Sequence, residues 1–326
     1  MPGKLLSIAI PTWNRQDIIS SSLPVLLSQI SGNEKDIQLI ISDNASEDDT
    51  VSKVSNLLGH YPEIDAVFFK QKENTGYYGN FRKCRELASG KYFWLLSDNE
   101  VLLNGGLSYI IDELKKNDKA GIVFLRNITG KSGLESLPLS FDELFVSENY
   151  KLTFISACIM LNIKEQDERI FNEFKGNSFL GFALLLSVRA HSNKALEISG
   201  EVYQSIPAVV SFNVFKCWTY DIFRCFEYID KEKLFTKEAV EKMKECIIVG
   251  VLKDHILHYR INNSYYGRDL GSFEENYSLL NSYYGYIELF KEITDIKNTS
   301  RSLLFYRRIK KKISNRIRKM TSPQKR

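Results

Sequence analysis

The sequence lacks the features that mark a membrane-spanning or secreted protein. None of its 326 residues lies in an uninterrupted apolar stretch of the roughly 18 residues that a transmembrane helix needs. Residues 1–4 show neither the basic region nor the cleavage site of a signal peptide, so we expect a cytoplasmic protein. The five cysteines form no CxxC pair and have no metal-binding spacing, which favours buried, reduced thiols.

The two common glycine-rich phosphate motifs are also missing. A dinucleotide-binding GxGxxG would follow the first apolar strand, but residues 11–15 at that point contain no glycine. No GxxxxGK[ST] loop occurs in the chain. These absences argue against dehydrogenases and P-loop nucleotidases. A nucleotidyltransferase stays open but is disfavoured, because its glycine-rich basic loop is reduced here to a single arginine.

Positive charge is concentrated at the end of the chain. The net charge is +4, yet residues 301–326 contain eleven Lys or Arg and no acidic residue, which leaves −7 for residues 1–300. Apolar residues recur there every four positions, at Phe305, Ile309, Ile313 and Ile317. The pattern predicts a basic amphipathic helix that binds an anionic membrane surface. A plain solvated terminus is the alternative, and because no upstream segment resembles a nucleic-acid module we expect no nucleic-acid partner.

Short apolar strands alternate with helices in the first third of the chain. Strands are expected at 5–10, 37–41, 64–69, 92–96 and 121–125, and helices at 17–29, 48–58, 78–88 and 106–116. This alternation predicts an α/β domain whose mainly parallel sheet is covered on both faces. Residues 126–150 are expected to form a loop, and beyond about residue 215 the pattern becomes helical.

Polar residues gather directly after four of these strands. The segments are PTWNR at 11–15, SDNAS at 42–46, ENTG at 73–76 and SDNE at 97–100. Ligands of parallel sheets bind beyond the carboxyl ends of the strands, so four such loops predict one composite site. Any single loop is also explained by turn chemistry, because Asn, Asp, Ser and Gly favour turns.

Two of these polar segments carry carboxylates suited to a nucleotide. Asp98 and Glu100 follow a buried strand and can share a divalent cation, Mg²⁺ or Mn²⁺, that keeps open positions for phosphate oxygens. Such a cation neutralises the charge that develops on a pyrophosphate leaving group. Asp43 ends the second strand, where a carboxylate can accept hydrogen bonds from a base or a ribose.

In order and spacing, the segments resemble glycosyltransferase family 2. The resemblance rests on IPTWNR at 10–15, SDNASEDDT at 42–50, Asn74-x-Gly76, Ala88-x-Gly90 and LSDNE at 96–100. Segments 74–81 and 92–96 are most similar to the abequosyltransferase-like branch. The strong match covers about residues 4–125 and thins out through about residue 205.

The resemblance implies a GT-A fold, which is a Rossmann-like mixed sheet flanked by helices, and a nucleoside-diphosphate sugar donor. It implies that the donor is bound by Pro11, Thr12, Asn14, Arg15, Asp43, Asn74, Gly76, Arg82, Asp98 and Asn99. Asp98 and Glu100 would hold the metal, and Asp98 would take part in catalysis. The family's acidic triplet is usually three aspartates, so Asn99 and Glu100 are departures that would weaken or shift the ion.

The catalytic base is the least determined part of the site. Inverting members deprotonate the acceptor hydroxyl with a carboxylate, often in a Glu-Asp pair ahead of a helix. Leu180 and Gly181 stand at the matching positions, and neither accepts a proton. The nearby candidates are Asp167, Glu168, Glu173 and His191. Glu173 is preferred, because it precedes a turn at Gly176 that leads into the predicted helix 179–189.

We therefore expect a GT-A domain over residues 1–210, with a nucleotide-sugar part at 1–125 and an acceptor part at 126–210. A helical extension would follow at 211–300 and the basic tail at 301–326. The expected reaction moves a sugar to a hydroxyl of a lipid-linked saccharide in O-antigen, capsule or other cell-surface polysaccharide synthesis, at the inner face of the plasma membrane. The alternative is a non-catalytic saccharide- or nucleotide-binding scaffold protein of a glycan assembly complex.

Overall fold

A computed structural model describes residues 3–207, 213–262 and 270–305. The chain divides into two compact units, Met1–Phe212 with Arg224–Thr236 and Asn213–Phe223 with Lys237–Arg326. Most of the basic tail, from residue 306 onward, lies outside the described residues, so its amphipathic helix stays a prediction. Among the described helices, none combines the length and the apolar character needed to cross a membrane.

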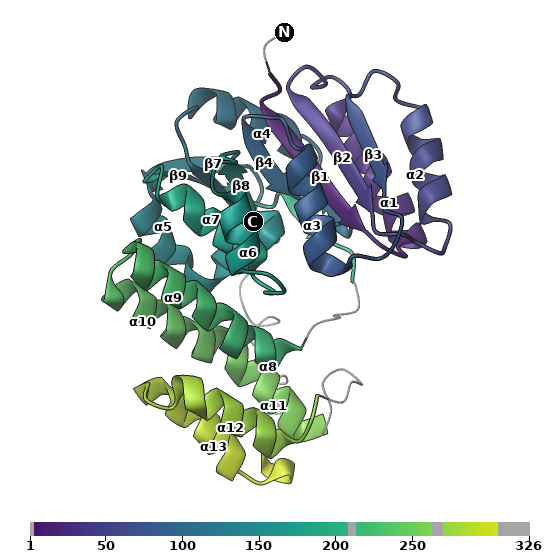
Figure 1. Ribbon diagram of the computed structural model, residues 1–326. Coiled ribbons are helices and arrows are strands. Elements are labelled where there is room, and N and C mark those ends of the chain that lie inside the picture. The colour runs from purple at the N-terminus through teal and green to yellow at the C-terminus, as the bar shows by residue number, and fades with distance from the viewer. Residues whose placement is uncertain (1–2, 208–212, 263–269, 306–326) are drawn as a thin grey trace, which may run out of the picture. The chain divides into compact units, whose positions relative to one another are not determined.

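The first unit is built on a mixed sheet of eight strands in the order β3-β2-β1-β4-β8-β6-β9-β7 (Figure 1). Its strands are β1 (Leu6–Thr12), β2 (Ile37–Asp43), β3 (Ala66–Lys70), β4 (Tyr92–Leu95), β6 (Ile122–Asn127), β7 (Glu135–Ser140), β8 (Cys158–Leu161) and β9 (Lys194–Gly200). Strands β1 to β4 are parallel, and β8 runs antiparallel to both β4 and β6. The predicted mixed α/β sheet is confirmed.

Helices cover both faces of this sheet. They are α1 (Gln16–Ile30), α2 (Thr50–Gly59), α3 (Gly76–Leu87), α4 (Gly106–Lys116), α5 (Phe141–Glu148), α6 (Asp167–Glu173) and α7 (Leu180–Arg189). Alternate residues of β1 and β2, such as Ile8 and Leu39, share one buried core with Leu23 of α1 and Ile110 of α4. On the opposite face, helix α3 packs against β1 and β2 and its ring of Phe81 meets Phe93 of β4, with centroids 6.3 Å apart (Figure 1).

A short two-stranded sheet adjoins the large one and was not predicted. It pairs β5 (Glu100–Leu102) with β10 (Tyr203–Ser205) in antiparallel register, so that Glu100 stands opposite Ser205. The triplet Asp98-Asn99-Glu100 therefore does not end in a loop. Its last carboxylate begins a strand whose partner lies about a hundred residues later in the chain.

The prediction of a loop over residues 126–150 is wrong. This segment contains the edge strand β7 and the helix α5. The sequence carried the signal for the helix, because Ser140 and Glu143 form a reciprocal capping box at its start. Strand β7 lies at the edge of the sheet, where Pro138 is tolerated because a backbone donor is not needed on the outer side.

The second unit is helical in its described part. Its elements include α8 (Val214–Lys216), α10 (Lys237–Ile247), α11 (Lys253–Asn262), α12 (Phe273–Tyr284) and α13 (Lys291–Asn298). Helix α9 (Ile222–Glu232) begins in this unit, but residues 224–236 belong to the first. The reason is packing: the ring of Phe235 stacks on Phe145 at 3.8 Å, and Arg169 forms an ion pair with Glu232 at 2.8 Å.

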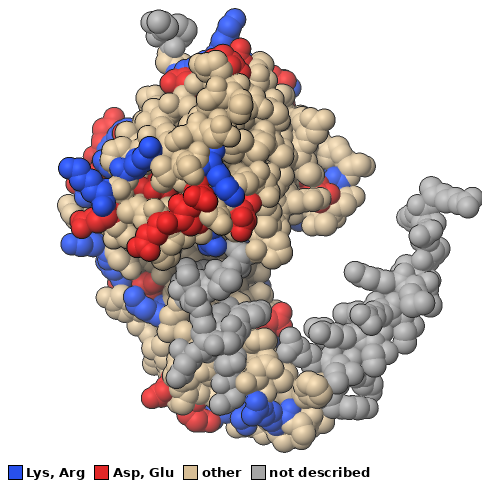
Figure 2. Space-filling view, turned by 90° about the vertical axis from the view of Figure 1, so that its right-hand side faces the viewer, with Lys and Arg blue, Asp and Glu red and all other residues tan. Residues whose placement is uncertain are grey.

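Charges of both signs are mixed on the face of the described residues drawn in Figure 2. Lys and Arg side chains there are interspersed with Asp and Glu rather than gathered into one broad basic surface. The concentration of positive charge noted in the sequence lies in residues 301–326.

Gly90 marks a close approach between the α3–β4 connection and β1. A Cβ at this position would lie 2.6 Å from the amide nitrogen of Ser7 and 2.8 Å from the carbonyl carbon of Leu6. Backbone atoms cannot move aside without disturbing the β1–β4 pairing, so we expect Gly90→Ala to lower the free energy of unfolding by about 1–3 kcal/mol. Urea denaturation measures this.

The matched control for that substitution is Gly59→Ala. No atom lies within 4 Å of a Cβ at Gly59, the last residue of α2. This variant should be neutral or up to about 1 kcal/mol more stable, because alanine is the better helix former. Equal stability of the Gly90→Ala variant and the wild type would show that the approach of backbone to backbone is not close.

Candidate active site at the carboxyl ends of the strands

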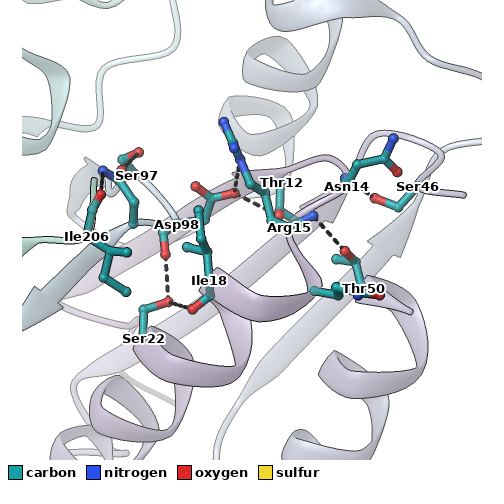
Figure 3. Close-up of polar contacts among 12 residues, drawn as sticks. Thr12, Asn14, Arg15, Ile18, Ser22, Ser46, Thr50, Ser97, Asp98 and Ile206 are labelled. Atoms are coloured by element: carbon teal, nitrogen blue, oxygen red, sulfur yellow. Dashed lines mark hydrogen bonds and ion pairs between the residues drawn. The ribbon is translucent and has the colours of Figure 1, made fainter. Parts of the chain in front are cut away.

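The polar loops after β1, β2, β3 and β4 are joined to one another at one edge of the sheet. Thr12 pairs with Asp43 in the parallel register of β1 and β2, which places the two loops that follow side by side. The amide of Asn44 donates to the carbonyl of Thr12 at 2.9 Å. The side chains of these loops then form the contacts described below, several of which are drawn in Figure 3.

Asp98 is the buried carboxylate at the centre of these contacts. Its Oδ2 accepts a hydrogen bond from Thr12 Oγ1 at 2.8 Å and lies 3.8 Å from Nε of Arg15, while Ser22 Oγ donates to its main-chain carbonyl at 2.6 Å (Figure 3). The residue is only 8% exposed, and burial raises the pKa of its carboxyl, although Thr12 and Arg15 act in the opposite direction. The structure thus brings Thr12, Arg15 and Asp98 together.

The loops after β1 and β2 are locked together through Ser46. Its hydroxyl donates to the buried carboxylate of Asp43 and accepts from the amide of Asn14 at 2.8 Å. Asn14 has a φ of +51°, a left-handed conformation that asparagine tolerates, and its Oδ1 accepts from the amide of Glu47 at 2.8 Å. Asn14 and the buried Asp43 are thus held together in the joined loops, and Ser46 is a structural partner that the sequence did not single out.

Asn44 holds the loop after β3. Its Oδ1 accepts from the amide of Thr75 at 2.9 Å, and its Nδ2 donates to Oδ1 of Asn74 at 2.9 Å and to the carbonyl of Gly76 at 3.2 Å. Gly76 has a φ of +70°, which favours glycine. The predicted residues Asn74 and Gly76 are thus part of the joined loops, and Asn44 is a missed residue that positions them.

The structure does not bring Arg82 into this cluster. Asn80 of α3 faces the strand ends, because its Nδ2 donates to the carbonyl of Ser42 at 3.0 Å. Residues two positions apart on a helix point about 200° apart, so Arg82 points elsewhere. It forms ion pairs with Glu86 at 3.0 Å and with Glu168 of α6 at 2.7 Å. Asn80, rather than Arg82, is the residue of α3 that contacts the strand ends.

Within the triplet Asp98-Asn99-Glu100, the two carboxylates are buried and the amide of Asn99 is half-buried. Glu100 is 5% exposed, and its carboxylate accepts a hydrogen bond from Ser205 Oγ at 2.7 Å. In the described chain it forms no ion pair, and burial raises its pKa. The amide of Asn99 is used within the protein: Nδ2 donates to the carbonyl of Ile206 at 2.9 Å, and Oδ1 accepts from Ser97 Oγ at 2.6 Å.

These carboxylates fit a divalent cation in part. Asp98 and Glu100 are buried. Arg15 lies 3.8 Å from Asp98, whereas Glu100 forms no ion pair among the described residues. No group of three or more His, Cys, Asp or Glu able to hold a metal is found among the described residues. A cation held by two protein carboxylates would need oxygen ligands from a phosphate or from water.

Glu173 forms no hydrogen bond or ion pair with the strand-end loops within the part of the chain that the structure describes. It is the last residue of α6, forms an ion pair with Lys231 at 3.1 Å, and accepts from Arg224 through its main-chain carbonyl. It borders a pocket of about 290 Å³ lined by Glu173, Phe174, Arg224, Glu227, Tyr228 and Lys231. The turn at Gly176 that leads into α7 has a φ of +72°, and Leu180 and Gly181 are buried in the first turn of that helix.

A family model matches much of the first unit and shows to which protein family the chain belongs. The family model of glycosyl transferase family 2 matches residues 7–171, which is just over half of the chain. The chain belongs to glycosyltransferase family 2. The matched region contains β1 to β4, the four polar loops and the acidic triplet.

Two curated relatives match part of this family 2 chain. GalNAc(5)-diNAcBac-PP-undecaprenol beta-1,3-glucosyltransferase of Campylobacter jejuni is 34% identical over 128 residues, covering 39% of this chain and 40% of that protein. Abequosyltransferase RfbV of Salmonella typhimurium is 29% identical over 170 residues, covering 48% and 49%. The chain thus spans less than half of the length of either relative.

Among solved structures, S. aureus TarS residues 1–349 resemble nearly the whole chain. The complex of TarS with UDP-GlcNAc gives a TM-score of 0.56 at 16% identity, covering 94% of this chain and 88% of that chain. The complex with UDP gives 0.54 at 18% identity. At such identities the likeness concerns the fold, and it agrees with the expected GT-A fold and its helical C-terminal extension.

Proposed function

We propose that this family 2 protein is a glycosyltransferase that moves a sugar from a nucleoside-diphosphate sugar to a hydroxyl of a saccharide. The observation that carries the proposal is the buried carboxylate of Asp98, held by Thr12 and Arg15 where four polar loops join. A site of this kind can hold a polar nucleotide in a fixed orientation and exclude water from its phosphates.

The donor is proposed to bind along the joined loops. Asp43 would accept hydrogen bonds from the base, and Pro11, Thr12 and Asn14 would line the nucleotide pocket. Asn74 and Gly76 would approach the nucleotide or its sugar, and the guanidinium of Arg15 would face the phosphates. TarS was solved with UDP and with UDP-GlcNAc, which supports a uridine nucleotide as the first donor to test.

A divalent cation, Mg²⁺ or Mn²⁺, is proposed to be held by Asp98 and Glu100. When bound, it would offset the negative charge that develops on the departing nucleoside diphosphate. Asp98 is oriented for this by the hydroxyl of Thr12 and by its main-chain contact with Ser22, and Glu100 by the hydroxyl of Ser205. The burial of both carboxylates and the lack of an ion pair at Glu100 within the described residues support this assignment.

The acceptor is proposed to be a lipid-linked saccharide of cell-surface polysaccharide synthesis, such as O-antigen or capsule. The Campylobacter relative is named for an acceptor attached to undecaprenol through a diphosphate, and the Salmonella relative is named an abequosyltransferase. We propose that the enzyme works at the inner face of the plasma membrane.

Glu173 is proposed as the carboxylate that accepts the proton of the acceptor hydroxyl. Its place beside a pocket of about 290 Å³ supports this, because an acceptor group needs space next to the base. We expect Glu173→Gln to lower kcat by about 100-fold or more with little change in the KM for the donor.

Glu168→Gln is the matched control for that variant. Glu168 lies on the same helix and also pairs with a cation, Arg82, but it does not line the pocket. Its kcat should stay within about twofold of the wild type. If Glu173→Gln turns over as fast as Glu168→Gln, Glu173 is not the base.

Membrane association is proposed for the basic tail. Each basic residue near an anionic surface contributes about 1 kcal/mol, so eleven of them supply strong attraction. Deleting residues 301–326 should abolish sedimentation with vesicles that contain phosphatidylglycerol. Vesicles of pure phosphatidylcholine are the control and should bind neither form. Unchanged binding of the truncated chain to the anionic vesicles would refute the proposal.

A non-catalytic scaffold protein is the second candidate function. It is favoured by the departures at Asn99 and Glu100 and by the absence of a carboxylate at Leu180 and Gly181. A panel of nucleotide sugars with and without Mn²⁺ separates the two. The enzyme should hydrolyse or transfer at least one sugar in the presence of Mn²⁺, whereas a scaffold would turn over none.

A further inference from the structure

The side chain of Asn99 ties two distant segments of the chain together. Its Nδ2 donates to the carbonyl of Ile206 at 2.9 Å, and its Oδ1 accepts from Ser97 Oγ at 2.6 Å. Its main-chain carbonyl accepts from the amide of Ile206 at 2.8 Å. Ser97 and Ile206 lie beside Asp98 in the close-up of Figure 3. Asn99 and Ile206 are thus joined twice.

This double contact requires an amide. An asparagine side chain offers a donor and an acceptor, whereas an ionised aspartate only accepts. An aspartate at position 99 would keep the hydrogen bond from Ser97 but would set a carboxylate oxygen against the carbonyl oxygen of Ile206. The substitution of the family's middle acid by asparagine therefore creates a contact rather than merely removing a charge.

The contact leads directly to Glu100. Ser205 precedes Ile206 and stands opposite Glu100 in the β5–β10 register. The hydroxyl of Ser205 donates to the carboxylate of Glu100 at 2.7 Å, and that carboxylate has no ion pair within the described residues. Ser205 is the last residue of β10, which pairs with β5, and the residue that follows it, Ile206, is hydrogen-bonded to Asn99. Both contacts fix the position of Ser205.

We infer that Asn99 is a positioning residue that, by fastening Ile206 to the acidic triplet, holds Ser205 against Glu100 and so orients the Glu100 carboxylate toward a divalent cation. The inference rests on the proposed function, since it assumes that Asp98 and Glu100 hold such an ion. It assigns to Asn99 neither contact with the donor nor ligation of the metal.

The decisive variant is Asn99→Asp, because the two possible roles of position 99 predict effects of opposite sign. If this position faces the cation, an added carboxylate strengthens binding of Mn²⁺ and UDP. If Asn99 acts through Ile206 and Ser205, the same substitution weakens it, by about 10- to 100-fold as for other residues that orient metal ligands. Calorimetric titration of UDP in the presence of Mn²⁺ measures the change.

Asn104→Asp is the matched control. Asn104 is exposed and lies five positions further along the chain, so it receives the same change of charge without the contact. We expect its Kd for UDP with Mn²⁺ to stay within about twofold of the wild type. Tighter or unchanged binding by Asn99→Asp would overturn the inference.

A second variant covers the case in which Asn99→Asp folds poorly, which circular dichroism would reveal. Ser205→Ala removes one hydroxyl from an exposed position and should weaken the Mn²⁺-supported affinity for UDP severalfold. When it is combined with Asn99→Asp, the affinity for UDP should fall little further, because both substitutions act on Glu100. No effect of Ser205→Ala, or full additivity, would contradict the proposed route through Ser205.

Hydrogen exchange separates failure of the inference from failure of the proposed function. The amide of Ile206 donates to Asn99, so its exchange should be slow in the wild type and faster in Asn99→Asp, without any ligand. If the wild type binds no UDP with Mn²⁺, the proposed function fails while this result still stands. Equal exchange in both proteins would show that Asn99 does not fasten Ile206.

Discussion

Asp98→Asn is expected to lower kcat for sugar transfer by about 100- to 1,000-fold. Asparagine keeps the shape of the side chain and can still accept from Thr12, but it removes the charge that is proposed to hold the cation. Burial raises the pKa of Asp98, so at neutral pH the ionised form is less favourable in the folded chain than in water. The variant should therefore unfold at the same or a higher temperature than the wild type.

Initial rates with the active nucleotide sugar, together with a thermal melt, measure both effects. Asp112→Asn is the control, because Asp112 is an exposed residue of α4 away from the strand-end loops. Its rate and melting temperature should match those of the wild type. A rate within about threefold of the wild type for Asp98→Asn would remove this carboxylate from the proposed mechanism.

Asp167→Leu is expected to cost about 3–5 kcal/mol of unfolding free energy. Arg85 is 1% exposed and forms a two-point ion pair with Asp167, through Nε at 2.9 Å and Nη2 at 3.2 Å. Its guanidinium also lies 5.0 Å from the ring centre of Phe93. Removing Asp167 leaves a buried charge without its partner, which costs far more than the pair itself contributes. Chemical denaturation measures the loss.

The double variant Arg85→Met with Asp167→Leu tests the reason for that loss. It removes both charges from the contact between α3 and α6 and should recover a substantial part of the lost stability. The recovery will be incomplete, because the carbonyl of Ile163 also loses its hydrogen bond from Arg85. If the double variant is as unstable as Asp167→Leu alone, lost packing rather than the unpaired charge is responsible.

The sequence was sufficient to predict the sheet and its site where the signals were local. Buried apolar runs such as residues 37–41 indicated strands, and the helices between them indicated a largely parallel arrangement. Because parallel strands end at the same edge, the sequence alone placed the polar segments after them at one site. The joined loops around Thr12, Asp43 and Asp98 show this placement directly.

The parts that the sequence missed depend on contacts between distant residues. Strand β5 has three residues, and it forms through pairing with residues 203–205. The direction of Arg82 could not be predicted, because the direction of a helical side chain follows from how α3 packs, and that packing turns Asn80 toward the strand ends. Asn44 resembled an ordinary turn residue, and only its four side-chain hydrogen bonds to three residues, Asn74, Thr75 and Gly76, show its role.

Contacts between distant residues also decide which unit each part of the predicted helical extension joins. Composition indicates that residues beyond about 211 are helical, but it does not indicate which unit a helix packs against. Residues 224–236 belong to the first unit because Phe235 and Glu232 find partners on α5 and α6. Those partners are aromatic and basic residues that no periodicity in either segment connects.

Calorimetric titration of UDP, CDP, GDP and dTDP into the wild-type protein, with and without Mn²⁺, tests the central claim most directly. The claim is that the loops after β1 to β4 bind a nucleoside diphosphate with the help of a cation held at Asp98. It predicts that at least one nucleotide binds, that Mn²⁺ tightens binding by about tenfold or more, and that Asp98→Asn removes the effect of Mn²⁺. Absence of binding by all four nucleotides, or binding that is indifferent both to Mn²⁺ and to Asp98→Asn, would contradict it.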